Sequence, residues 1–66
     1  MKDVYKGYMK LTPNGWTVSY ERGTFHNTLR IAPDDCKDFE FTDRGWIFFK
    51  IVTIDGKQRA KIERRQ

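Results

Sequence analysis

The chain has 66 residues and a formal net charge of +4, with 13 Lys and Arg against 9 Asp and Glu. At this length we expect a single domain over residues 1–66, near the lower limit for a core without disulfides or metal. The lone cysteine, Cys36, excludes an internal disulfide and favours a reducing, cytoplasmic location. No apolar run approaches the roughly 20 residues of a membrane-spanning helix, and residues 1–10 lack the apolar region of a signal peptide, so we expect no membrane association.

The first two expected elements are strands joined by a tight turn. Side chains over residues 5–11 alternate between a mainly apolar face and a mainly polar face, which is typical of a half-buried strand. One face carries Tyr5, Gly7, Met9 and Leu11, and the other carries Lys6, Tyr8 and Lys10. The TPNG sequence at residues 12–15 predicts a type I turn with a glycine bulge. Alternation resumes at Trp16, Val18 and Tyr20 and predicts the return strand.

The middle of the chain predicts shorter elements. Residues 21–27 are polar, contain a glycine and show no period, so we expect a loop there. A third strand is expected over residues 28–32, with Leu29 and Ile31 facing the core and Pro33 ending it. Proline followed by two acids predicts one short helical turn near residues 33–37.

A brief strand and a turn are expected before the last hairpin. Phe39 and Phe41 flank Glu40 and indicate the strand, and TDRG at residues 42–45 indicates the turn.

The longest strand is expected over residues 46–54, followed by a two-residue turn at Asp55 and Gly56. Residues 57–66 are then either a return strand or a helix, because they include good helix formers. Only Ala60 and Ile62 would face a core from such a helix, so the strand is preferred.

Counting outward from the turn predicts the register of this hairpin. The expected pairs are Ile54 with Lys57, Val52 with Arg59, Ile51 with Ala60, Lys50 with Lys61, Phe49 with Ile62, and Phe48 with Glu63. The core face then contains Ile47, Phe49, Ile51, Ala60 and Ile62. The opposite face contains Trp46, Phe48, Lys50, Val52 and Ile54 beside Lys57, Arg59, Lys61 and Glu63.

Together these elements predict a mainly β fold with five to six short antiparallel strands and at most one short helical turn. The strands would form a curled sheet or a small SH3-like or OB-like barrel, because closing a sheet hides edges that a flat meander exposes.

Aromatic and basic side chains interleave on the non-core face of the last hairpin. Rings on which bases stack and cations that contact phosphates are what single-stranded nucleic-acid binding requires. We therefore expect a small binding module for RNA or single-stranded DNA, with candidate residues Trp46, Phe48, Lys50, Lys57, Arg59, Lys61 and Arg64. Opposed Lys50 and Lys61 repel each other, and a bound anion would relieve this.

Two other interpretations of the same face stay open. Tryptophan and arginine also dominate protein interfaces, so the face could bind a protein partner, mediate self-association or serve a structural subunit of a larger assembly. Alternatively, lysine and arginine stems simply lie across the aromatic rings, and the loop at residues 21–27 covers the rest.

No pattern in the sequence indicates catalysis, a cofactor or a metal site. His26 has no second histidine or cysteine at ligand spacing, and neighbouring acids disfavour a Cys36 thiolate. Residues 34–43 contain five acids and one lysine but lack the spacing of a calcium loop. We expect a protein that is not an enzyme. The acidic segment and the basic residues 57–66 form a charge dipole that could orient a partner or a second copy, although solubility is its simpler role.

Overall fold

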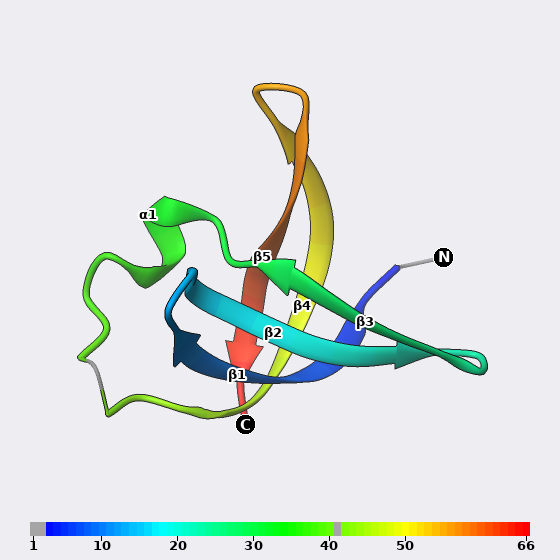
Figure 1. Ribbon diagram of the computed structural model, residues 1–66, viewed down its shortest axis with the longest axis horizontal. Helices are drawn as coiled ribbons and strands as arrows, with labels where there is room; N and C mark the ends of the chain where they lie inside the picture. Colours follow the sequence, from blue (N-terminus) through cyan, green and yellow to red (C-terminus); the bar gives the residue numbers. More distant parts are fainter. Residues whose placement is uncertain (1–2, 41) are drawn as a thin grey trace.

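The computed structural model describes residues 3–40 and 42–66 as one five-stranded sheet with a short helical turn (Figure 1). The elements are β1 (Tyr5–Thr12), β2 (Gly15–Arg22), β3 (Phe25–Arg30), α1 (Pro33–Cys36), β4 (Gly45–Ile54) and β5 (Lys57–Arg65). The mainly β fold and the helical turn after Pro33 are confirmed, and residues 57–65 are a strand rather than a helix.

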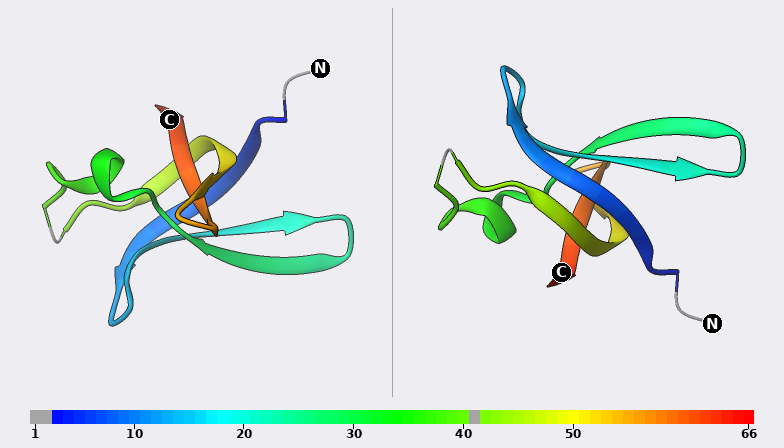
Figure 2. Two further views of the ribbon diagram at one scale, coloured as in Figure 1. Left: turned by 90° about the horizontal axis from the view of Figure 1, so that it is seen from above. Right: turned by 90° about the horizontal axis from the view of Figure 1, so that it is seen from below.

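The strand order is β3-β2-β1-β4-β5, with every neighbouring pair antiparallel. Three strands joined by hairpins are followed by a fourth that returns beside the first, which is a Greek-key arrangement. The sheet curls but does not close into a barrel. Over residues 3–40 and 42–66, the pairing between its two ends is a parallel bridge from Ile31, just after β3, to Ala60 of β5. Seen from above and below, the β2–β3 hairpin extends away from this meeting point (Figure 2).

Two of the turns depend on backbone conformations with positive φ. Asp55 and Gly56 have φ values of 52° and 77°, as a two-residue type I′ hairpin requires. Gly23 has a φ of 63° and begins a second two-residue turn, Gly23–Thr24. The predicted loop at residues 21–27 is therefore wrong, because glycine permits a tight turn and the flanking polar residues pair as strands.

The core lies on the concave face of the sheet. The largest fully buried side chains are those of Phe49, Met9, Ile47 and Val18, and Ala60 is also fully buried. Ile51 and Ile62 pack against this cluster while remaining partly exposed. Leu11, predicted on the same face as Met9, is 44% exposed because it lies near the end of β1. The predicted core face of the last hairpin is thus confirmed.

The register of β4 and β5 follows the prediction from the turn as far as the Phe49–Ile62 pair. A β-bulge between Phe48 and Phe49 then shifts the register, so Phe48 lies opposite Arg64. The predicted Phe48–Glu63 pair is wrong, because the bulge leaves one extra residue on β5.

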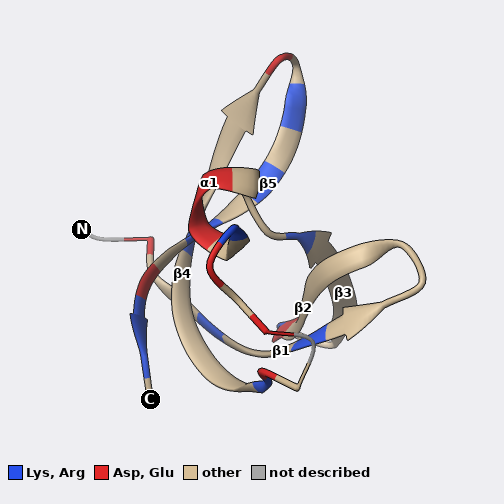
Figure 3. Ribbon diagram, turned by 90° about the vertical axis from the view of Figure 1, so that its left-hand side faces the viewer, with Lys and Arg blue, Asp and Glu red and all other residues tan. Residues whose placement is uncertain are grey.

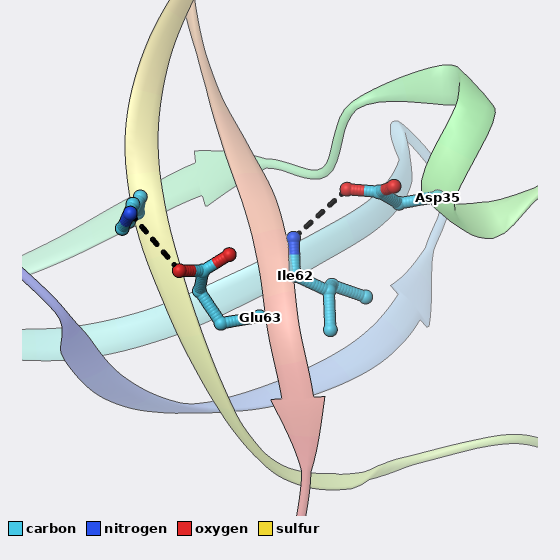
Figure 4. A network of polar contacts seen from close by, with 4 residues as sticks. Asp35, Ile62 and Glu63 are labelled. Carbon is cyan, nitrogen blue, oxygen red and sulfur yellow. Dashed lines mark hydrogen bonds and ion pairs between the residues drawn. The ribbon is translucent and has the colours of Figure 1, made fainter.

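The segment after β3 folds back along the edge of β5. The Ala32 N–H donates to the Ala60 carbonyl at 2.8 Å, and the Ile62 N–H donates to Asp35 Oδ2 at 2.8 Å (Figure 4). The third strand was predicted over residues 28–32 but spans Phe25–Arg30. Ile31 and Ala32 lie beyond it because they pair with Ala60 of β5.

The brief strand predicted around Glu40 is also wrong. Phe39 and Glu40 belong to no strand, and Phe41 lies outside the described residues. The Phe39 ring instead packs edge-on against Trp16, with ring centroids 5.0 Å apart. Within residues 3–40 and 42–66, no helix is long and apolar enough to cross a membrane.

Candidate nucleic-acid interface

The pairing of β1 with β4 brings aromatic and basic side chains together on the convex face of the sheet. Tyr8 lies opposite Trp46, and Lys6 lies opposite Phe48. The Tyr8 and Trp46 rings meet edge to face, with centroids 5.4 Å apart. Edge-to-face contact is a favourable arrangement of two aromatic rings. The Trp46 side chain is still 50% exposed, so much of its surface is accessible.

Two cations lie over these rings. The Lys6 ammonium is 5.4 Å from the Trp46 ring centroid and 5.7 Å from that of Phe48. The Arg64 guanidinium is 4.3 Å from the Phe48 ring centroid. Lys6 on β1 and Arg64 on β5 therefore flank Phe48 from the two strands that neighbour β4. Cation–π attraction therefore holds a lysine and an arginine beside the same phenyl ring.

We call this set of five residues the aromatic–basic face: Lys6, Tyr8, Trp46, Phe48 and Arg64. A shallow hollow beside Trp46 continues from this face over the outer sides of β2 and β3, where Ser19, Glu21 and His26 line it. Residues 21–27 belong to the β2–β3 hairpin rather than to a loop that covers the face, and Glu21 and His26 only flank it at the hollow. Trp46 thus presents a half-exposed side chain next to this hollow.

Acids lie near this face without pairing with its cations: Glu63 lines a hollow with Phe48 and Arg64, and Glu21 lines the hollow beside Trp46. Among the described residues, neither Lys6 nor Arg64 has a carboxylate within ion-pair distance. The nearest basic strand neighbours behave differently: the Lys50 ammonium lies 3.1 Å from Glu63, and Arg65 lies 3.8 Å from Asp43. The two cations of the face remain available to an external anion.

The repulsion between Lys50 and Lys61 is relieved inside the chain. These residues are directly opposed, as predicted, and the Glu63 carboxylate lies beside Lys50 (Figure 4). A bound anion is therefore not needed to explain this pair.

The predicted candidate residues separate into two groups along the hairpin. Trp46, Phe48 and Arg64 join the aromatic–basic face, and Lys50 lies next to it in its ion pair with Glu63. Lys57, Arg59 and Lys61 lie further along β5 toward the turn. The Arg59 guanidinium donates to the neighbouring Gln58 carbonyl at 2.9 Å, and no ring contact joins any of these three to the aromatic cluster within the described chain.

Lys6 and Tyr8 were not among the predicted site residues. Their alternation with the core-facing side chains of β1 did predict that they share the non-core face. What the sequence did not predict is that β1 pairs with β4, because no turn signal links two strands so far apart along the chain.

The acidic segment is placed against the basic strand of the same molecule. α1 and its neighbours lie beside β5 (Figure 3), with Asp35 and Asp43 contacting Ile62 and Arg65. Arg65 also lies 5.2 Å from the Phe39 ring centroid. The charge dipole predicted from the sequence is therefore partly neutralised by intramolecular contacts at this edge.

Two residues were considered for chemistry from the sequence, His26 and Cys36. His26 Nδ1 is 4.0 Å from Glu21 on the exposed hairpin. The pKa of the Cys36 thiol is raised, first by burial and then by the charge of Asp35. Over the part of the chain that the structure describes, no group of three or more His, Cys, Asp or Glu residues could hold a metal ion.

No protein-family model, curated protein or solved structure matches this chain.

Proposed function

We propose that this domain binds single-stranded nucleic acid, RNA or DNA, through the aromatic–basic face. The observation that carries the proposal is the arrangement of Lys6 and Arg64 around Phe48, beside a half-exposed Trp46. Each base has a π-face that stacks on an aromatic ring, and each phosphate carries a charge that a nearby cation neutralises.

The geometry of β4 supports the contact with consecutive nucleotides. Trp46 and Phe48 are two residues apart on one strand, so they project from the same side about 7 Å apart. In this proposal one base stacks on the open face of Trp46, and its neighbour stacks on the Arg64 guanidinium that lies over Phe48. The phosphate between them interacts with Lys6, which lies near both rings.

The strand arrangement is in keeping with this proposal. An open five-stranded Greek-key sheet is also the architecture of OB-like folds, which bind oligonucleotides across the outer sides of strands 2 and 3. The hollow beside Trp46 extends over those two strands here. Because one fold hosts many functions, this likeness adds to the argument from the face and does not replace it.

A protein-interaction module is the second candidate. The observation favouring it is that Val4, at 36% exposure, lines a shallow hollow with Phe48, Glu63 and Arg64, which adds an exposed apolar side chain beside the face. Arginine and aromatic residues in such a setting also anchor protein partners.

The test is a titration of fluorescein-labelled oligo(dT) and oligo(U) at two salt concentrations. Trp46→Ala should weaken binding by the roughly 1–3 kcal/mol that stacking of one base contributes, with little change in salt slope. Lys6→Ala and Arg64→Ala should each lower the salt slope by about 0.7, the value for one phosphate contact on a single strand. RNA and DNA are compared in parallel because nothing on the face distinguishes the sugar.

Matched controls use residues outside the face. Phe25→Ala removes an aromatic side chain that is 74% exposed on β3, and Lys37→Ala removes an exposed cation from the acidic segment. Neither should change oligonucleotide affinity more than slightly. Absence of binding at low salt, or equal losses in the controls and the face variants, would contradict the proposal and leave the protein-interaction module.

A further inference from the structure

A second surface, separate from the aromatic–basic face, opens between the two hairpins. The β2–β3 and β4–β5 hairpins leave the body of the sheet in different directions (Figure 1), and the space between them forms a wedge. Tyr20 and Ile51 line the wedge, Phe25 lies on β3, and Gln58 lies on β5. The wedge narrows toward the Ile31–Ala60 bridge, where the two end strands meet.

One wall of the wedge is an unpaired strand edge. The Ile31 N–H donates to the Trp16 carbonyl of β2 at 3.0 Å, so alternate residues of β3 point their backbone groups toward β2. The backbone groups of His26, Thr28 and Arg30 therefore point away from β2. Ala32, the next residue in this series, does donate across the gap to β5.

The protection of the two end strands differs. On β5 the outward-facing groups of Ala60 and Ile62 are bonded to Ala32 and Asp35. On β3, within the described residues, no strand pairs with the outer edge before the Ile31 bridge. Its sequence, FHNTLR, contains no proline or lysine, two residues with which proteins commonly blunt an edge.

The side chains and charges of the wedge also favour an occupant. Phe25 is 74% exposed, more than any other large hydrophobic side chain in the described part of the chain. Arg22 lines the wedge, whereas Lys57 and Arg59 lie on the opposite face of β5 from Gln58, which lines it. No aspartate or glutamate is among the described residues that line it.

We propose that the outer edge of β3 binds an extended acidic peptide segment, which adds a strand to the sheet within the wedge. Only a polypeptide repeats N–H and C=O groups at the spacing of a strand edge, which favours a peptide over a nucleic acid here. Its acidic residues interact with Arg22, while an apolar residue covers Phe25. This site is independent of the proposed nucleic-acid interface.

The test uses a fluorescein-labelled peptide of alternating glutamate and valine that is at least as long as the six residues of β3. Fluorescence anisotropy measures its binding to the full chain. The same peptide with N-methyl groups on alternate residues keeps its charge and side chains but cannot donate hydrogen bonds along one edge. We expect roughly tenfold weaker binding for the methylated peptide because two or more hydrogen bonds are lost.

The protein variants test the same edge from the other side. Thr28→Pro removes an outward-facing N–H without removing a bond to β2, a position at which edge strands tolerate proline. Thr28→Val keeps the N–H and is the matched control. Thr28→Pro should lose roughly tenfold in peptide affinity and Thr28→Val should retain it. Circular dichroism and the thermal midpoint of both variants check that the sheet is intact. If Thr28→Pro fails to fold, Arg22→Glu provides a second test, because it should also weaken peptide binding.

Other outcomes overturn the proposal. Equal binding of the methylated and unmethylated peptides would mean adsorption by charge alone. A solution mass of two chains that Thr28→Pro reduces to one, without peptide binding, would mean that a second copy occupies the edge. Trp46→Ala should leave peptide binding unchanged, and Phe25→Ala should weaken it. Their effects on oligonucleotide binding are the reverse, so either proposal can fail without the other.

Discussion

The Glu63 carboxylate lies 3.1 Å from the Lys50 ammonium, across the bulge that separates the Phe48–Arg64 pair from the Phe49–Ile62 pair. The bulge has two consequences for the candidate interface. It turns Arg64 onto the Phe48 ring, where a strict ladder would have placed Glu63. It also pairs the displaced carboxylate with a lysine that would otherwise add to the positive charge of the face.

The first prediction concerns that carboxylate. Glu63→Gln frees Lys50 and removes a negative charge beside the aromatic–basic face, so oligonucleotide affinity at low salt should rise about two- to fivefold, the scale of an exposed ion pair. The titration described above measures the change. Glu40→Gln, an exposed acid of the acidic segment, is the matched control and should have little effect. An unchanged or lower affinity for Glu63→Gln would show that Lys50 does not contribute.

The second prediction concerns the core face of β4. Phe49 is fully buried and packs against Tyr5 and Tyr20, with ring centroids 5.8 and 5.1 Å away. Phe49→Ala should lower the free energy of unfolding by about 3–5 kcal/mol, and the milder Ile47→Val by about 0.5–1.5 kcal/mol. Val52→Ala should cost visibly less than Phe49→Ala because Val52 is partly exposed. Urea denaturation measures all three, and a larger loss for Val52 would place the core on the opposite face.

The third prediction concerns the close approach of β1 to β2 at Gly7. A Cβ at this position would lie 2.6 Å from Val18 Cγ2 and 2.7 Å from the Ser19 carbonyl oxygen. Gly7→Ala should therefore destabilise the domain by about 1–3 kcal/mol, as overpacking does. Adding Val18→Ala should not restore stability, because the Ser19 carbonyl is backbone and cannot retract. Thermal denaturation of the single and double variants tests this, and recovery in the double variant would contradict it.

The fourth prediction concerns the contact between the acidic segment and β5. Asp35 Oδ2 accepts the Ile62 N–H across 27 residues of sequence. Asp35→Ala should cost about 1.5–3 kcal/mol, as expected for a hydrogen bond to a charged group. It should also accelerate hydrogen exchange at the Ile62 amide. Asp34→Ala, which removes the same charge from an exposed neighbour, should leave that exchange rate unchanged; equal acceleration by both variants would point to charge alone.

The fifth prediction concerns pH. Burial and the charge of Asp35 raise the pKa of the folded Cys36 thiol above that of the unfolded chain. The protonated thiol therefore favours the folded state at lower pH, and this contribution is lost as pH rises through the folded pKa. Iodoacetamide alkylation should have a higher pH midpoint in the folded protein than in urea. Asp35→Asn should lower the folded midpoint while Asp34→Asn changes it less, and identical midpoints in the folded and unfolded chains would refute this.

Local sequence determined the last hairpin and its core face. The Asp55-Gly56 turn and the period-two alternation around it specify the register as far as the Phe49–Ile62 pair, because each depends only on residues near in sequence. The same holds for the turn at residues 12–15 and the helical turn after Pro33, which the structure confirms. Trp46 and Phe48 could for this reason be named as candidates from the sequence alone, whereas Arg64 reaches their face only through the bulge.

Only the tertiary structure decided what surrounds those candidates. The pairing of β1 with β4 brought Lys6 and Tyr8 to Trp46 and Phe48, and no local signal specifies a contact between strands separated by two hairpins and a long connection. The bulge between Phe48 and Phe49 was not specified by the turn, and β5 on either side of it contacts the acidic segment at Asp35 and Asp43. Alternation assigns a side chain to a face, whereas the neighbours it meets there depend on contacts between distant segments that form together as the chain folds.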